Sequence, residues 1–240
     1  MSETEEINGF NLKRDDFGWQ KYHESFKHNF GKFDPYEDFK LAYRFDLNVC
    51  ARPIWVVTKP DFEANLGTVS AQIVSAVSFI QEVVGDPEIS IIRVGPTSPQ
   101  DQMAYLRYGT TPDQEGLLFS EQSLKDIVLE PKVVQAAIVH ELIHNYLEYK
   151  ESPHAFDETL PVLTEICYLA LNKQPPRILS GKTIVGDKYE APITEAVEIL
   201  KSKFGLSPEL SSFQVFDWLE ANASREDVVG MIKDEVQKLL

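Results

Sequence analysis

Residues 133–150 read VVQAAIVHELIHNYLEYK, and this stretch decides how the rest of the chain is interpreted. Pro131 suits a first helical turn, and no glycine or proline follows it before Pro153. Apolar residues recur in between at the spacing of one helical face, namely Val134, Ala137, Ile138, Leu142 and Ile143. The pattern therefore predicts a buried helix over residues 131–149.

The same helix carries the motif His140-Glu141-Leu142-Ile143-His144, which matches H-E-x-x-H. Side chains at i and i+4 lie on one face of a helix, so both imidazoles can bind one metal ion. Glu141 follows the first histidine directly and can act on a water at that ion. Two histidines beside a glutamate are costly on a buried helix without a partner. The motif therefore favours a zinc site over an ordinary core helix.

The chain is acidic, with a formal net charge of −15. No block of Lys or Arg exceeds two residues, so we expect no nucleic-acid partner and repulsion from an anionic membrane surface. The N-terminus has no apolar signal segment, and no apolar run is long enough for a membrane span. These features predict a soluble, cytoplasmic protein, and they leave its oligomeric state undetermined. Cys167 lies in an apolar helical run, which favours a core position over a ligand position.

Composition divides the chain into three segments. Residues 1–9 are acidic and polar, which predicts disorder. Residues 10–205 are expected to form the main domain, and residues 10–45 within it are rich in aromatic side chains. That density favours short helices and turns packed over the main core, with a partner-binding aromatic surface as the alternative. Residues 206–240 are predicted to form a helical appendage.

The predicted elements begin with strand 53–58, helix 68–84 and strand 89–94, which form a βαβ unit with parallel strands. Two short extended segments, 104–108 and 116–120, precede the motif helix. The later helices are expected at residues 159–172, 192–204, 207–221 and 225–239.

Two histidines do not complete a catalytic zinc site, which has three protein ligands and an open fourth position. The longer pattern H-E-x-x-H-x-x-G-x-x-H needs a histidine where this chain has Lys150. The other candidates lie downstream of the motif, at Glu151, His154, Asp157, Glu158 and Glu165.

Two of these candidates share one helical face. Glu165 falls among apolar residues, where a carboxylate needs a partner such as a metal ion. Glu158 lies two turns earlier on the same face. It can be the ligand itself, orient a histidine, or be a favourable charge near a helix N-terminus.

By its motif and the order of its elements, about half of the chain resembles the gluzincin branch of the zincin metallopeptidases, which includes the thermolysin-like enzymes. In that branch the third zinc ligand is a glutamate on the next helix, about twenty residues past the second histidine. The resemblance therefore implies Glu165 as the ligand, with Glu158 as the alternative. The N-E-x-x-S-D signature typical of thermolysin is absent, so the likeness is to the superfamily.

The resemblance also implies a fold of the α+β class. It is a zincin-like fold, in which a small mixed β-sheet with an antiparallel edge strand packs on the H-E-x-x-H helix. In this chain, extra N- and C-terminal helices would be added to it.

The implied activity is that of a zinc-dependent peptidase acting on a peptide or protein substrate. One Zn²⁺ bound by His140, His144 and a carboxylate would lower the pKa of its water towards ~7, and Glu141 would act as general base. The substrate would lie extended along the edge formed by residues 104–120. A tyrosine or a histidine would share the oxyanion, and the tyrosine candidates are Tyr189, Tyr168 and Tyr105.

Two other functions fit the same sequence. In one, zinc serves structure or sensing, the fourth coordination position is occupied and nothing is hydrolysed. In the other, the zincin-like body is a scaffold whose aromatic N-terminus and C-terminal helices recruit a partner. A complex that survives His140→Ala but is lost on truncating either end would favour the scaffold.

Overall fold

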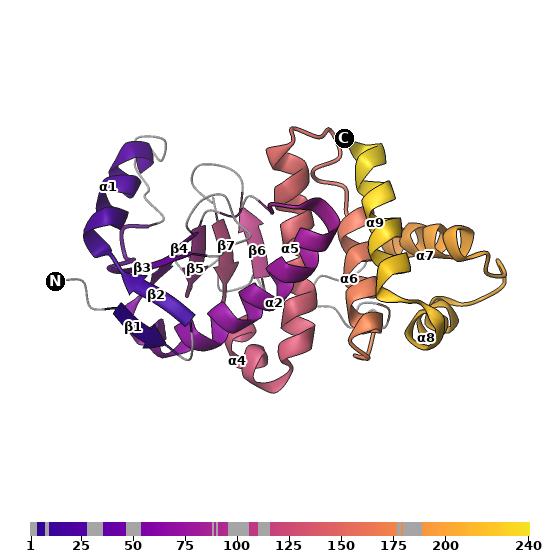
Figure 1. Ribbon diagram of the computed structural model, residues 1–240, viewed down its shortest axis with the longest axis horizontal. Helices are drawn as coiled ribbons and strands as arrows, with labels where there is room; N and C mark the ends of the chain where they lie inside the picture. Colours follow the sequence, from indigo (N-terminus) through magenta and orange to yellow (C-terminus); the bar gives the residue numbers. More distant parts are fainter. Residues whose placement is uncertain are drawn as a thin grey trace.

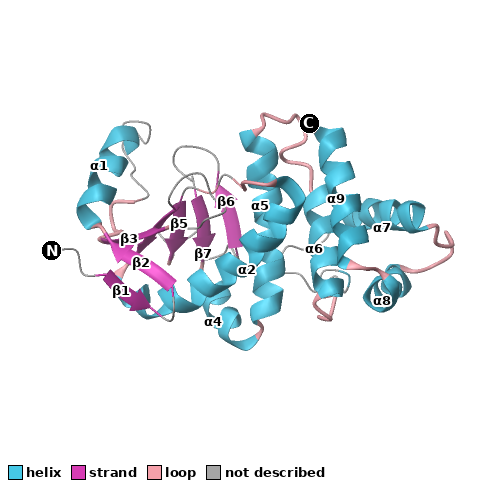
Figure 2. Ribbon diagram, viewed as in Figure 1, coloured by secondary structure: helices cyan, strands magenta, loops and turns pink. Residues whose placement is uncertain are grey.

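The computed structural model describes residues 4–7, 10–27, 36–46, 54–87, 89, 91–95, 106–109, 116–176, 179 and 189–240. The strands are β1 (Thr4–Ile7), β2 (Phe10–Arg14), β3 (Leu41–Phe45), β4 (Ile54–Thr58), β5 (Ile91–Val94), β6 (Leu106–Gly109) and β7 (Gly116–Phe119). The helices are α1 (Asp16–Phe26), the 3-10 helix η2 (Pro60–Asn65), α2 (Leu66–Val84), α4 (Glu121–Leu129), α5 (Pro131–Tyr149), α6 (Thr159–Leu171), α7 (Glu190–Phe204), α8 (Ser212–Asn222) and α9 (Arg225–Leu239). The protein is therefore a mixed α/β structure, with the sheet towards one end and helices α5 to α9 towards the other (Figure 1, Figure 2).

One mixed sheet contains all the described strands, in the order β1-β2-β3-β4-β5-β7-β6. The neighbours β4, β5 and β7 run parallel, and the other pairs are antiparallel. Helix α2 connects β4 to β5, which confirms the predicted βαβ unit with parallel strands. All of β5 is buried, as expected for a parallel strand that is covered on both faces.

The edge of the sheet beside the motif helix is formed by β6, which pairs antiparallel with β7. Helix α5 packs against this strand. The predicted antiparallel edge strand next to the motif helix is thereby confirmed. Among the described strands, none pairs with the outer side of β6.

The N-terminal segment differs from the expectation. Disorder was predicted over residues 1–9, and helices and turns over residues 10–45. In the structure, β1 lies within the first of these segments, and β2 and β3 precede and follow α1 in the second. All three strands extend the sheet. In β3, Tyr43 and Phe45 face the main core and Ala42 faces the opposite side, which is the alternation of a strand. Arg44 between the two aromatic residues is exposed, so Tyr43, Arg44 and Phe45 follow the apolar–polar alternation of a half-buried strand. The sheet is consequently larger than the small sheet predicted.

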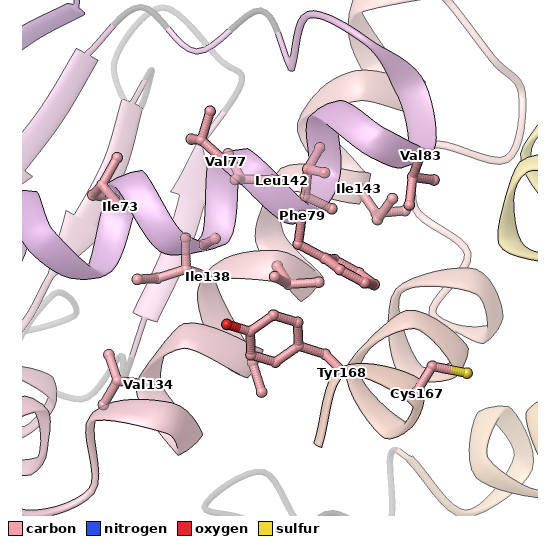
Figure 3. Close-up of a cluster of buried hydrophobic side chains, with 14 of the residues drawn as sticks. Ile73, Val77, Phe79, Val83, Val134, Ile138, Leu142, Ile143, Cys167 and Tyr168 are labelled. Atoms are coloured by element: carbon pink, nitrogen blue, oxygen red, sulfur yellow. The ribbon is translucent and has the colours of Figure 1, made fainter. Parts of the chain in front are cut away.

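The main core lies between the sheet and helices α2, α5 and α6 (Figure 3). Phe79 of α2 and Tyr168 of α6 meet edge to face there, with ring centroids 5.1 Å apart. Cys167 is free and buried in the same cluster, which confirms its predicted core position. The apolar face predicted for α5 is buried in this core at Val134, Ile138, Leu142 and Ile143.

Among the described helices, the stretch Pro60–Val84 is long and apolar enough to cross a membrane when judged by length and composition. Half of its most apolar window is nevertheless buried inside the protein. Helix α2, which makes up most of the stretch, packs against α5. These contacts are those of a core helix in a folded domain.

A smaller aromatic cluster covers the opposite face of the sheet. Helix α1 places Trp19 against Tyr36, with ring centroids 5.4 Å apart and the rings edge to face. The described aromatic residues of the N-terminal segment therefore pack mainly as core, as the sequence favoured, although Phe17 is exposed. The buried members of the cluster are Trp19, Tyr36, Phe39, Ala42, Val57 and Ile91.

The C-terminal helices pack on the main body. Helices α8 and α9 contact α6, and α9 also contacts α2. Arg225 at the start of α9 donates two hydrogen bonds of 2.8 and 2.9 Å to the carboxylate of Glu82 on α2. Apolar side chains such as Phe216 and Ile232 belong to the same buried cluster as the core of the sheet. The end of α9 lies beside the connection between α5 and α6 (Figure 1).

Candidate metal centre

Helix α5 presents the two motif histidines side by side. Their spacing of one helical turn brings the ring centroids of His140 and His144 to 5.1 Å. His140 is buried, and the side chain of His144 is 17% exposed. Helix α6 packs against α5. The groups that face the two imidazoles are Glu165 of α6, its N-cap residue Glu158, and the carbonyl of Ala155 in the preceding loop.

The Nδ1 atom of each histidine has its own partner. His140 Nδ1 lies 3.0 Å from Glu165 Oε2, and His144 Nδ1 lies 2.8 Å from the carbonyl oxygen of Ala155. A carbonyl and a carboxylate can only accept, so Nδ1 donates in both cases. We assign the ring protons from these partners. Both Nε2 atoms consequently present a lone pair when the imidazoles are neutral.

These two Nε2 atoms converge on one carboxylate oxygen. Oε2 of Glu158, at the N-terminal end of α6, lies 3.2 Å from His140 Nε2 and 3.1 Å from His144 Nε2. The three ligand atoms lie within 4.8 Å of one another, and they form the one potential metal-binding group found among the described residues. Three lone-pair donors at one point repel each other unless a cation lies between them. The donor set of two imidazoles and a carboxylate fits a catalytic zinc ion.

The two carboxylates also control the charge on His140. Burial lowers the pKa of His140, but hydrogen bonds to Glu158 and Glu165 outweigh it and, with the charges of Glu165 and Glu141, raise the pKa to about 10. A proton on this imidazole therefore supplies the positive charge when no metal does. Binding of a metal ion would displace that proton.

The sequence favoured Glu165 over Glu158 as the third ligand, and the structure brings Glu158 to that position instead. Glu165, which the resemblance implied, lies on the Nδ1 side of His140, away from the point where the ligand atoms converge. Glu158, the alternative, is the carboxylate that joins the histidines. The two glutamates share one face of α6, as their spacing predicted, and they hold His140 from two sides. Both His154 and Asp157 are exposed and lie outside the group.

The start of α6 at Thr159 is the one predicted from the sequence, so the exchange arises from how α6 packs on α5. Glu158, the N-cap residue of α6, lies level with the Nε2 atoms, and Glu165, two turns later, lies level with Nδ1 of His140. A sequence pattern locates a helix but does not fix which of its turns lies opposite a given group on another helix.

The remaining site candidates lie around the same point. Glu141 is half-buried, and its charge contributes to the raised pKa of His140. The ring of Tyr189, at the start of α7, lies 6.1 Å from that of His140 in an edge-to-face arrangement. Burial, followed by the charges of Glu158, Glu141 and Glu165, raises the pKa of the Tyr189 phenol, so the hydroxyl keeps its proton.

The other two tyrosine candidates are not brought to this point. The hydroxyl of Tyr168 donates to Gln135 Oε1 at 2.7 Å, inside the core. Tyr105 lies outside the described residues.

Sequence reasoning missed the acceptor of His144, because a backbone carbonyl belongs to every residue and leaves no pattern. The signal that was available is the short connection between α5 and α6, which must fold back to bring any downstream acid to the motif.

Comparisons of the chain with protein-family models, with curated protein sequences and with solved structures gave no match, so the geometry of the site is the basis for any statement about function.

Proposed function

We propose that the protein is a zinc-dependent peptidase with a zincin-like fold, and that His140, His144 and Glu158 are its zinc ligands. The observation that carries this proposal is the convergence of two Nε2 atoms and one carboxylate oxygen, with both Nδ1 atoms already held by acceptors. Structural zinc sites usually have four protein ligands. Three protein ligands, of which His140 is buried and His144 and Glu158 are partly exposed, suit a site that leaves a position for water and substrate.

Each neighbouring group then has a defined task. Glu165 and the carbonyl of Ala155 fix the orientation and tautomer of the two imidazoles. Glu141 removes the proton of the attacking water and delivers it to the leaving amine. The phenol of Tyr189 donates a hydrogen bond to the developing oxyanion. When bound, Zn²⁺ supplies Lewis acidity, which polarises the substrate carbonyl and lowers the pKa of water towards ~7.

The substrate is proposed to be a peptide in an extended conformation. Strand β6 is the sheet edge next to α5, and its outer side has no strand neighbour among the described residues. A peptide added there would form backbone hydrogen bonds with β6 and run past the motif helix. This mode of binding recognises the backbone and leaves side-chain preference open.

The test of the proposal is metal analysis combined with hydrolysis of a fluorescence-quenched peptide library. We expect one zinc per chain, with hydrolysis that stops on chelation by 1,10-phenanthroline and returns when Zn²⁺ is added. A protein that purifies without zinc and does not take it up would contradict the whole proposal. Stoichiometric zinc without hydrolysis would instead favour the non-catalytic zinc-binding function.

A matched pair of tyrosine variants separates catalysis from stability. Tyr168→Phe removes the hydrogen bond to Gln135 and is expected to lower the free energy of unfolding by about 1 kcal/mol without changing kcat. Tyr189→Phe is expected to lower kcat by about 10²-fold and to leave stability and zinc content unchanged. Chemical denaturation and steady-state kinetics on the same preparations provide the two measurements. Equal kcat values in Tyr189→Phe and the wild type would remove Tyr189 from the mechanism.

A further inference from the structure

The connection between α5 and α6 carries two of the groups at the metal centre, the carbonyl of Ala155 and the side chain of Glu158. The buried side-chain hydroxyl of Ser152 in this connection takes part in two hydrogen bonds. Ser152 is 8% exposed, and its Oγ donates to the carbonyl oxygen of Leu239 at 2.6 Å. The same Oγ accepts from the backbone N–H of His154 at 3.1 Å. Ser152 thus joins the last turn of α9 to the loop that closes the site.

One series of hydrogen bonds leads from Ser152 to a metal ligand. The backbone N–H of Ala155 donates to the carbonyl of Ser152 at 3.1 Å. The carbonyl of Ala155 in turn accepts from Nδ1 of His144 at 2.8 Å. The position of Ser152 therefore sets the position of the acceptor that holds His144.

A second series leads to the other side of the site. The backbone N–H of Asp157 donates to the carbonyl of His154 at 2.9 Å, and the backbone N–H of Thr159 donates to Asp157 Oδ1 at 2.9 Å. Glu158 lies between these last two residues. The backbone of Glu158 is therefore held by this series of hydrogen bonds, which begins with the bond from His154 N–H to Ser152 Oγ.

The path into the loop is also fixed. Helix α5 ends with Ser152 N–H donating to the carbonyl of Leu147 at 2.9 Å and Glu151 N–H donating to that of Glu148 at 2.8 Å. This is the Schellman arrangement, and Glu151 occupies its left-handed position with φ of 54°. A non-glycine residue in that conformation is tolerated where the surroundings hold it. The contact of Ser152 with α9 is one such restraint.

We propose that Ser152 is a positioning residue for the metal centre, through which the last turn of α9 orients His144 and Glu158. This inference rests on the proposed zinc centre. Without the hydroxyl, the loop would lose its bond to α9 and the bond that starts the turn before Glu158. Two of the three ligands would then be less well pre-organised, and the metal ion would have to order them on binding.

The experiment measures the dissociation constant for Zn²⁺ alone, by competition with a chromophoric chelator, at a temperature where every variant is folded. We expect Ser152→Ala to weaken zinc binding about tenfold, the lower end of the range for groups that orient metal ligands. Ser152→Thr keeps the hydroxyl and is expected to restore most of the affinity. The visible absorption bands of the Co²⁺-loaded protein are expected to shift in Ser152→Ala and to return in Ser152→Thr, because they report ligand geometry.

Thr58→Val provides the matched control. Thr58 is buried as well, and its hydroxyl lies 3.1 Å from two backbone carbonyl oxygens, those of Val94 and Lys59, to which it donates. This variant is expected to lose stability and to keep the zinc affinity of the wild type. A general loss of stability is thereby distinguished from a loss of ligand positioning.

Two results would overturn the inference. If the wild type binds zinc and Ser152→Ala binds it equally well, Ser152 does not position the site, and the proposed function is unaffected. If Thr58→Val weakens zinc binding as much as Ser152→Ala does, the effect is one of overall stability. A wild type that binds no zinc removes the proposed function and this inference together.

Discussion

Glu141→Gln is expected to lower kcat for peptide hydrolysis by about 10²–10⁴-fold, the usual contribution of a general base. The amide keeps the size and hydrogen-bonding capacity of the side chain but cannot take a proton from water. Because Glu141 is not among the converging ligand atoms, the zinc content is expected to remain at one per chain. The measurements are steady-state hydrolysis and metal analysis on the same preparation.

The matched control is Glu148→Gln, which makes the same chemical change two turns further along α5. Glu148 is also half-buried, and it has no proposed part in the reaction. It is expected to keep full activity. Peptidase activity that survives unchanged in Glu141→Gln would show that another group is the base.

Glu158→Ala is expected to abolish stoichiometric zinc binding, because it removes the oxygen that lies 3.1–3.2 Å from both Nε2 atoms. Glu165→Ala removes the acceptor of His140 Nδ1 and leaves the ligand atoms in place. It is therefore expected to weaken zinc binding by roughly 10–100-fold without abolishing it. Equilibrium dialysis against buffered Zn²⁺ distinguishes a lost site from a weakened one.

This pair of variants decides between the two glutamates. Glu209→Ala, an exposed acid outside the metal-binding group, serves as the control for a general loss of negative charge and is expected to bind zinc normally. If Glu165→Ala abolished binding and Glu158→Ala only weakened it, the ligand set would be the one implied by the gluzincin resemblance. Loss in both variants to the same degree would favour a site in which both carboxylates contact the ion.

Part of the fold could be predicted because its pattern is local. Helices α5 and α9 begin and end where the sequence placed them, since an amphipathic repeat and its capping residues lie within one continuous stretch. The parallel pairing of β4 with β5 followed from the helix between them. The pairing of β2 with β3 did not follow, because the partners Leu12 and Phe45 are 33 residues apart in the sequence. The pairing of β1 with β2 was encoded locally, since Asn8-Gly9 between them is a sequence typical of a tight hairpin turn.

The candidate site likewise has a part that local sequence predicts and a part that depends on tertiary contacts. The sequence by itself determined that His140, Glu141 and His144 share one helix and that an acid downstream must close the site, because i and i+4 positions on a helix are adjacent whatever surrounds them. Only the tertiary structure decided that Glu158 joins the histidines while Glu165 and Ala155 orient them. Which turn of α6 lies opposite α5 depends on how the intervening loop folds and on what holds it. That loop is bonded to α9, a partner 87 residues away, and no local pattern encodes such a contact.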